Sequence, residues 1–377
     1  MANQQAPIHR MHSSRIKIIF HIGLEKTGTT SFQRFCTRNA RRLIQHKVLY
    51  PKRSSAFYAL NHAPLTASYL PSERPDDFYL RSTITNSEMV KSLKREIEAS
   101  SVAKVIISSE HLSSRFRAPQ IEKLAEDFNE YECQIVIALR DHLSRLFSSY
   151  STRVMSGSDQ TLNEYAEMVL KPDNLYMRYA DTIRMWEEAF GRDNVIVFDY
   201  NEESDVISSI LSKIALLHLR TELTDDHKCN ASLDATVIEA LRLINIANLN
   251  ESAYRSKIAY LEFIKLQYVR SVLRKKLQAL SHGSHWRLSE PYRDQLLDIA
   301  EADTLWLAKS HAMTVSLIKP RSLPEAAPDE FQDAVAKLLA KILTQTICDR
   351  WTLYRFNMFS RAALFLVLEK LRNIRRR

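Results

Sequence analysis

Glycine is scarce in this chain, with five among 377 residues, and two of the five lie close together near the N-terminus. Gly23 and Gly28 both fall within the stretch IIFHIGLEKTGTTSFQR, which runs from Ile18 to Arg34. Glycine gives the backbone a conformational freedom that other residues lack. Two glycines in so short a segment therefore indicate a turn whose geometry matters.

Cysteine is equally rare, and long apolar runs are absent. The four cysteines, Cys36, Cys133, Cys229 and Cys348, lie far apart and form no C-x-x-C pair, which excludes the common zinc patterns and a disulfide framework. No run of about 18 apolar residues predicts a membrane span. Met1–Ser14 is polar and lacks the apolar region of a signal peptide, so we expect a disordered leader over residues 1–14 and a cytoplasmic protein.

The chain has an ordinary globular composition but an uneven charge. Hydrophobic residues make up 45% and charged residues 26%, and the net charge is +9. Met1–Ser55 carries eleven Lys or Arg against Glu25, and Arg350–Arg377 carries eight against Glu369. This distribution favours an anionic ligand for the N-terminal part. For the basic tail it leaves two alternatives, peripheral contact with an anionic membrane or a solvated helix. We expect no nucleic-acid partner.

Short apolar runs alternate with amphipathic segments over the first 200 residues. This alternation predicts βαβ units, and hence an α/β fold with a central parallel sheet. The predicted strands are Lys17–His21, Val48–Tyr50, Lys104–Glu110, Cys133–Leu139 and Asn194–Asp199. The predicted helices are Thr29–His46, Ser87–Ser101, Pro119–Tyr131, His142–Met155 and Leu175–Phe190, the last of which ends at Gly191.

Beyond Tyr200 the pattern becomes almost wholly helical. The predicted helices are Asp205–Leu217, Leu233–Asn245, Ser252–Leu280, Glu290–Lys309 and Pro328–Ile374. We expect one domain over residues 15–320, with the α/β core reaching about 220 and a helical part over 221–320. Residues 321–377 would form a helical extension with the basic tail. Lys52–Pro75 shows no clear period and is predicted to be a long surface loop.

Polar residues follow three of the predicted strands. Lys26–Gly28, Ser108–Glu110 and Arg140–Asp141 stand at their carboxyl ends. Ligands of open parallel sheets bind beyond those ends. The sequence therefore predicts a site there.

The loop at the first strand end has the chemistry of an anion site. Lys26, Thr27, Gly28, Thr29 and Thr30 offer backbone N–H groups, hydroxyls and one ammonium at the start of a helix, which suits a phosphate or a sulfate. The lysine precedes the second glycine, unlike the nucleotide-hydrolase loop G-x-x-x-x-G-K-[ST]. Asp141 comes after Arg140 rather than directly ending its apolar strand, so a triphosphate with Mg²⁺ is disfavoured and we expect no metal site.

At this point the motifs resemble a family. HIGLEKTGTTSFQ is similar to the 5′-phosphosulfate loop of sulfotransferases that use 3′-phosphoadenosine-5′-phosphosulfate (PAPS). Arg140 and Ser148, in LRDHLSRLFSSY, match the family's second motif, an arginine at a strand end with a serine eight residues later. The resemblance covers Arg15–Asn201 well and Lys228–Lys309 fairly, and segments of the later range are similar to bacterial carbohydrate-type members. No resemblance is found beyond Pro320.

The resemblance implies a three-layer P-loop fold and transfer of a sulfuryl group from PAPS, which leaves adenosine 3′,5′-bisphosphate (PAP). It implies that the loop Lys26–Thr30 holds the phosphosulfate, with Lys26 neutralising charge on the bridging oxygen. Arg140 and Ser148 would hold the 3′-phosphate. The expected acceptor is a hydroxyl or amine of a carbohydrate, polysaccharide or glycolipid, as in polysaccharide biosynthesis.

Three residues are candidates for the general base that takes the acceptor's proton. Glu110 comes first because it ends a buried strand beside the loop. His111 is the rival, because small-molecule sulfotransferases carry a catalytic histidine at the equivalent strand end, and His62 in the long loop is third. For Glu110 the alternative is a strand-end acid paired with Lys26 or Arg140, and for the histidines a structural role.

Two other functions stay open at this point. A P-loop kinase acting on a small molecule would bind ATP and depend on Mg²⁺. A non-catalytic member of the fold would bind a glycan or a membrane and turn nothing over.

Overall fold

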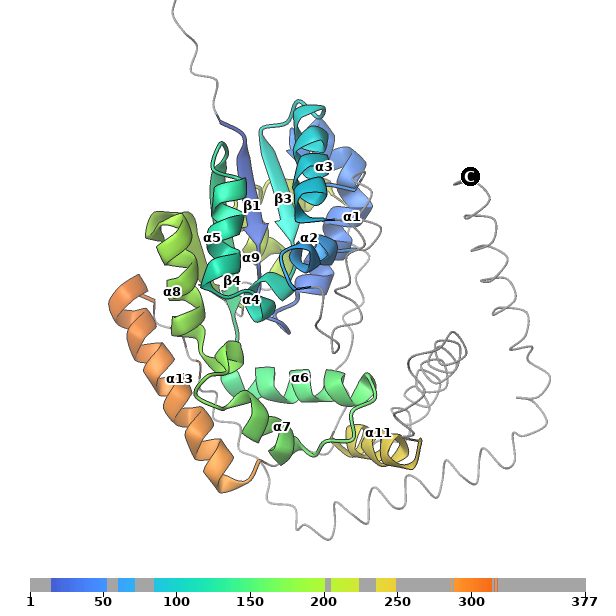
Figure 1. Ribbon diagram of the computed structural model, residues 1–377, viewed down its shortest axis with the longest axis vertical. Coiled ribbons are helices and arrows are strands. Elements are labelled where there is room, and N and C mark those ends of the chain that lie inside the picture. The colour runs from blue at the N-terminus through green and yellow to red at the C-terminus, as the bar shows by residue number, and fades with distance from the viewer. Residues whose placement is uncertain are drawn as a thin grey trace, which may run out of the picture. The chain divides into compact units, whose positions relative to one another are not determined.

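A computed structural model of the chain (Figure 1) describes residues 15–52, 60–71, 85–200, 205–223, 235–248, 286, 288–313, 315 and 317. Its contacts divide the chain into two compact units. The first comprises Met1–Tyr150, Thr161–Ala231 and Leu288–Arg321, and the second comprises Ser151–Gln160, Ser232–Arg287 and Ser322–Arg377. The domain boundaries expected near 220 and 320 stay predictions.

The first unit is built on a parallel sheet of five strands in the order β2-β3-β1-β4-β5. The strands are β1 (Lys17–His21), β2 (Val48–Leu49), β3 (Lys104–Ser108), β4 (Glu132–Leu139) and β5 (Val195–Asp199). All five predicted strands are therefore present, although the strand expected over Lys104–Glu110 ends at Ser108. The three strands that the polar clusters follow, β3, β1 and β4, are neighbours in the sheet.

Helices cover both faces of this sheet, which makes the three layers that were predicted. Along β1, Ile18 and Phe20 belong to one hydrophobic core and Ile19 to another. The first core takes side chains from α3 (Asn86–Glu98), α5 (Ala118–Asp127) and α8 (Tyr179–Phe190), and the second from α1 (Thr29–Gln45) and α9 (Val206–Lys213). A strand with apolar neighbours on both faces must be apolar throughout, which explains its lack of alternation.

Further helices complete the first unit. They are α2 (Ala63–Ser68), α4 (His111–Arg115), α6 (His142–Met155), α7 (Leu162–Val169), η2 (Leu175–Met177), η3 (Arg192–Asn194), α10 (Leu219–Glu222) and α13 (Glu290–His311). The second unit shares the last turns of α6. It also contains α11 (Ala235–Asn248), where Asn245 donates from Nδ2 to the carbonyls of Val154 and Ser158.

Two predicted elements differ from the structure. The loop expected over Lys52–Pro75 contains the buried helix α2. This helix has only six residues, which is too short for a hydrophobic period to be recognised in the sequence. The single helix expected over Leu175–Phe190 is divided into η2 and α8, because Arg178 between them has an extended backbone with φ −105° and ψ 91°. Gly191 does end α8, as predicted, with φ +82°.

A carboxylate from α13 fixes the start of α8. Asp303 accepts hydrogen bonds from the backbone N–H groups of Tyr179 and Ala180, both at 2.9 Å. It also lies 3.0 Å from Nε2 of the buried His142. Because the first N–H groups of a helix have no acceptor within the helix, Asp303 supplies one that is distant in sequence. It thereby ties α13 to the core.

The leader, the helices expected over Ser252–Leu280 and Pro328–Ile374, and the basic tail lie outside the described residues. Within the described ranges, no helix is both long enough and apolar enough to cross a membrane.

Candidate functional site

The loop after β1 forms a concave backbone turn. Lys26 has φ +74° and Gly28 has φ +76°, whereas Thr27 between them and Thr29 after them have negative φ, so the sign alternates along four residues. Such alternation turns successive N–H groups toward one centre and makes an anion-binding nest. A lysine in the left-handed region costs roughly 1–3 kcal/mol, so other contacts must hold Lys26 there.

Gly28 is required both by its conformation and by its neighbours. A Cβ atom there would lie 2.8 Å from Cγ1 of Val206 and 3.1 Å from Cε2 of Tyr200. α1 begins immediately afterwards, so the N–H groups of Thr29 and Thr30 have no acceptor within the helix. Thr30 is exposed at this helix start, while Thr27 is buried and donates from Oγ1 to the carbonyl of Leu24. The loop therefore offers N–H groups and the positive end of a helix dipole to an anion.

The second predicted anion residue, Arg140, lies against this loop. Its Nη1 donates a 2.8 Å hydrogen bond to the carbonyl of Lys26, and its guanidinium lies 5.5 Å from the centre of the Tyr200 ring. Ser148 is half-buried on α6, eight residues further on, and its role stays a prediction. The structure thus brings the two motifs together across the neighbouring strands β1 and β4.

The ammonium of Lys26 lies among charges of both signs. Burial lowers its pKa below the ordinary value, and the neighbouring carboxylates of Glu25 and Glu110 act in the opposite direction. The guanidinium groups of Arg140 and Arg145 lower the pKa further. The two carboxylates therefore help to keep Lys26 protonated.

Glu110 stands half-buried at the start of α4, where it is held by the helix that follows the loop. Nε2 of Gln33 on α1 donates a 2.7 Å hydrogen bond to Oε2 of Glu110. The same amide lies 3.3 Å from Oγ of Ser108, which in turn lies 2.8 Å from Nδ1 of His21. The carboxylate is therefore oriented by a buried polar chain that starts from β1.

The two candidate histidines have different surroundings. His111 is half-buried on α4, its charge lowers the pKa of Glu25, and its buried Nδ1 has no hydrogen-bond partner among the described residues. His62 is fully buried, with Nδ1 accepting from the N–H of Ser108 at 3.0 Å and Nε2 lying 3.1 Å from the carbonyl of Pro51. Burial lowers the pKa of His62 to about 4. The geometry supports a structural role for the neutral His62, joining the ends of β2 and β3, and gives no support to it as a base.

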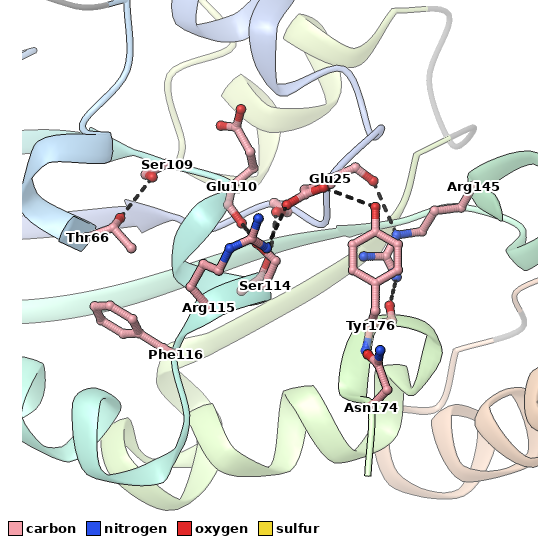
Figure 2. A network of polar contacts seen from close by, with 12 residues as sticks. Glu25, Thr66, Ser109, Glu110, Ser114, Arg115, Phe116, Arg145, Asn174 and Tyr176 are labelled. Atoms are coloured by element: carbon pink, nitrogen blue, oxygen red, sulfur yellow. Dashed lines mark hydrogen bonds and ion pairs between the residues drawn. The ribbon is translucent and has the colours of Figure 1, made fainter. Parts of the chain in front are cut away.

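Sequence reasoning missed the carboxylate network beside the loop (Figure 2). Oε2 of Glu25 accepts a 3.1 Å hydrogen bond from the hydroxyl of Tyr176, and Oε1 lies 3.5 Å from Nη1 of Arg115. Burial raises the pKa of Glu25, but Arg115, a hydrogen bond from Ser114 and the neighbouring cations outweigh burial and leave that pKa below its ordinary value. Glu25 is therefore an anion of the loop whose carboxylate is held by two elements, α4 and η2.

Arg145 is the second residue that was missed. Its side chain is 1% exposed, its Nε donates a 3.2 Å hydrogen bond to the carbonyl of Glu25, and its Nη1 donates to the carbonyl of Tyr176. Its guanidinium lies 4.2 Å from the centre of the Tyr176 ring and 5.2 Å from that of Tyr179. Arg145 lies within the quoted segment LRDHLSRLFSSY, but nothing in that pattern distinguishes it from a surface arginine.

No group of three or more His, Cys, Asp or Glu side chains within the described part of the chain is arranged to hold a metal ion.

Comparison with known proteins bears on residues 17–226, which contain the whole sheet. Residues 17–226 match the family model described as Sulfotransferase domain, which is more than half of the chain. A search of curated proteins finds no match.

Two solved structures are similar at low identity. One, described as a sulfotransferase from Alicyclobacillus acidocaldarius, is 16% identical with a TM-score of 0.38, covering 73% of this chain and 98% of that one. The other comes from the PezAT chromosomal toxin–antitoxin system of Streptococcus pneumoniae and is 12% identical with a TM-score of 0.26, covering 70% and 88%. At these TM-scores neither adds to the family match. On the match over residues 17–226, the chain belongs to the sulfotransferase domain family.

Proposed function

We propose that the protein transfers a sulfuryl group from PAPS to a hydroxyl or amine of a carbohydrate, polysaccharide or glycolipid. Membership of the sulfotransferase family supports sulfuryl transfer, and PAPS is the donor that the two motifs suit. The observation that carries the proposal is the 2.8 Å hydrogen bond from Nη1 of Arg140 to the carbonyl of Lys26. This hydrogen bond joins the nest formed by the loop to the guanidinium of Arg140, so that the two can bind one ligand with two separated anionic groups.

In this site the residues of the loop would bind the 5′-phosphosulfate. The N–H groups at the start of α1 and the ammonium of Lys26 would stabilise the negative charge that builds on the bridging oxygen as the sulfur–oxygen bond to the phosphate breaks. Preorganised donors of this kind are commonly the largest catalytic contribution, and loss of one costs roughly 10²–10³ in rate. Arg140, with Ser148, would bind the 3′-phosphate.

Glu110 would accept the proton of the acceptor as its oxygen or nitrogen bonds to sulfur. General-base catalysis contributes about 10²–10⁴ in rate and requires an oriented base. The hydrogen bond from Gln33 supplies that orientation and leaves Oε1 as the atom to take the proton. His111, whose Nδ1 is buried without a partner among the described residues, is the second candidate.

The cellular context of this activity is part of the same proposal. The acceptor precursor would be sulfated in the cytoplasm, and the basic tail would let the protein meet an anionic membrane at its periphery. A single experiment with liposomes tests the last point, since binding to phosphatidylserine vesicles should fall when residues 350–377 are removed.

Isothermal titration with adenosine 3′,5′-bisphosphate and with ATP tests the donor. We expect tight binding of the bisphosphate without a metal ion, and loss of that binding in Arg140→Ala. The kinase alternative predicts a preference for Mg²⁺-ATP, and this result would overturn the proposal. The non-catalytic alternative predicts binding of the bisphosphate but no transfer of labelled sulfate to any extract of glycans or lipids.

A further inference from the structure

The carbonyl groups of two consecutive loop residues are each held by an arginine. Nε of Arg145 donates to the carbonyl of Glu25 at 3.2 Å, and Nη1 of Arg140 donates to the carbonyl of Lys26 at 2.8 Å. Arg140 also belongs to the proposed 3′-phosphate site, so its two roles overlap. Arg145 is fully buried behind the loop, between the rings of Tyr176 and Tyr179, and has no surface from which to meet a ligand.

The hydrogen bond from Arg145 determines where the next N–H points. A trans peptide is planar and directs its C=O and its N–H to opposite sides. Since the carbonyl of Glu25 points toward Arg145, the N–H of Lys26 points away from it. The same peptide precedes the left-handed residue Lys26, so its orientation helps to set the direction from which the lysine side chain leaves the loop.

The side chain of Glu25 provides a second anchor for the same peptide. Tyr176 donates to Oε2 from its hydroxyl, and its main-chain carbonyl accepts from Arg145, so one residue of η2 contacts both partners (Figure 2). Arg115 lies beside the other carboxylate oxygen. A buried arginine is stable only when an opposite charge lies nearby and its N–H groups have acceptors. Here the carboxylate of Glu25 supplies the charge, and the carbonyls of Glu25 and Tyr176 accept the hydrogen bonds.

We propose that Arg145 is a positioning residue for sulfuryl transfer: with Tyr176 and the side chain of Glu25, it fixes the Glu25–Lys26 peptide in the orientation that binds the 5′-phosphosulfate. The proposal rests on the proposed function, because it assigns the loop to the 5′ end of the donor. The three groups, Arg145, Tyr176 and the side chain of Glu25, would support the loop without contacting the donor. Their effect should therefore be confined to ligands that carry a 5′-phosphate.

Two nucleotides distinguish this role from general support of the fold. Adenosine 3′,5′-bisphosphate has the phosphate that the loop would bind, and adenosine 3′-monophosphate lacks it. In Arg145→Lys, which keeps the charge but loses the Nε donor, we expect the affinity for the bisphosphate to fall about 10- to 100-fold, as for loss of a hydrogen bond from a charged group. The affinity for the 3′-monophosphate, measured by competition, should equal that of the wild type.

A milder variant decides the matter if Arg145→Lys does not fold. Tyr176→Phe removes only the hydroxyl that donates to Glu25 and keeps the ring and the main-chain carbonyl in place. We expect about a 3- to 10-fold loss of bisphosphate affinity. The matched control is Tyr69→Phe, which removes a 2.8 Å hydrogen bond from a tyrosine to the carboxylate of Asp127 on α5 and should leave both affinities unchanged.

The outcomes separate the inference from the proposed function. Failure of the wild-type protein to bind the bisphosphate would overturn the proposed function. Wild-type binding that persists undiminished in Tyr176→Phe and in a folded Arg145→Lys would overturn the positioning role alone. Equal weakening of both nucleotides, together with a lower melting temperature, would show that Arg145 merely supports the fold and would also overturn it.

Discussion

The amide of Gln33 donates a 2.7 Å hydrogen bond to the carboxylate of Glu110, joining the helix that follows the loop to the end of β3. Gln33 lies one helical turn after Thr29, the first residue of α1. The residue that orients the proposed base is therefore carried by the same helix whose start would bind the donor. A shift of α1 would disturb both at once.

This relationship makes a prediction about Glu110. In Glu110→Gln, we expect titration with adenosine 3′,5′-bisphosphate to give wild-type affinity, because the loop is unchanged. Transfer of radiolabelled sulfate to an acceptor extract should fall by about 10²–10⁴, because the amide cannot take a proton. Near-normal transfer in this variant would move the role of base to His111.

The orienting role of Gln33 can be tested against a matched amide on the same helix. Gln33→Ala should lower the transfer rate about 10-fold at saturating donor, the effect of losing one hydrogen bond to a charged group. Asn39→Ala also removes a buried amide from α1, one that donates to the carbonyl of Phe35, and it should leave the rate unchanged. Equal losses in the two variants would mean that the rate reports the stability of α1.

Gly28 is expected to be irreplaceable for a steric reason. Gly28→Ala places a methyl group 2.8 Å from Cγ1 of Val206, so we expect a loss of bisphosphate affinity as the loop shifts. Gly191→Ala is the control: it also puts alanine at positive φ, but its methyl group lies 3.6 Å from Nδ2 of Asn194, so stability should fall and affinity should not. The double variant with Val206→Ala should recover part of the affinity; no recovery would refute the steric explanation.

Two buried histidines predict how stability depends on pH. Burial lowers the pKa of His62 to about 4 and that of His21 to about 3, from an ordinary 6.5. At a pH between 6.5 and the lowered pKa of each histidine, the unfolded chain binds protons that the folded protein does not. The free energy of unfolding should therefore fall as pH drops from 6.5 toward 4. For His62 the loss amounts to roughly 3 kcal/mol over that window.

Urea denaturation at pH 7 and pH 5 measures this dependence. In His62→Gln, which has no proton to take up, the difference between the two pH values should be smaller than in the wild type. The variant should also be less stable at pH 7, because the hydrogen bonds to Ser108 and Pro51 are disturbed. An unchanged difference would assign the pH dependence to other groups.

The sheet and the two anion motifs could be predicted from the sequence because they leave contiguous patterns. KIIFH and CQIVIAL contain apolar runs without alternation, as is typical of strands covered on both faces. Arg140 follows its strand directly, and Lys26 comes a few residues after the other. Arg145 left no such pattern, because it meets the loop through the main-chain carbonyl of Glu25, which any residue supplies. Tyr176 reaches the carboxylate of Glu25 from a distant segment, and no local pattern marks that pair. The burial of His62 was missed because the six-residue helix after it is too short to show a period, so the segment was predicted to be a surface loop.

The carboxylate of Asp303 has a consequence for how the protein can be shortened. The family match stops at residue 226, yet the N–H groups that begin α8 depend on an acceptor located some way further along the chain. A fragment that ends at the boundary of the match would lose the carboxylate that accepts from those donors, at a cost of about 1.5–3 kcal/mol for each hydrogen bond to a charged group. It would also loosen η2, from which Tyr176 reaches Glu25. We therefore expect a stably folded fragment to extend through α13, so truncations for expression should be designed beyond residue 311.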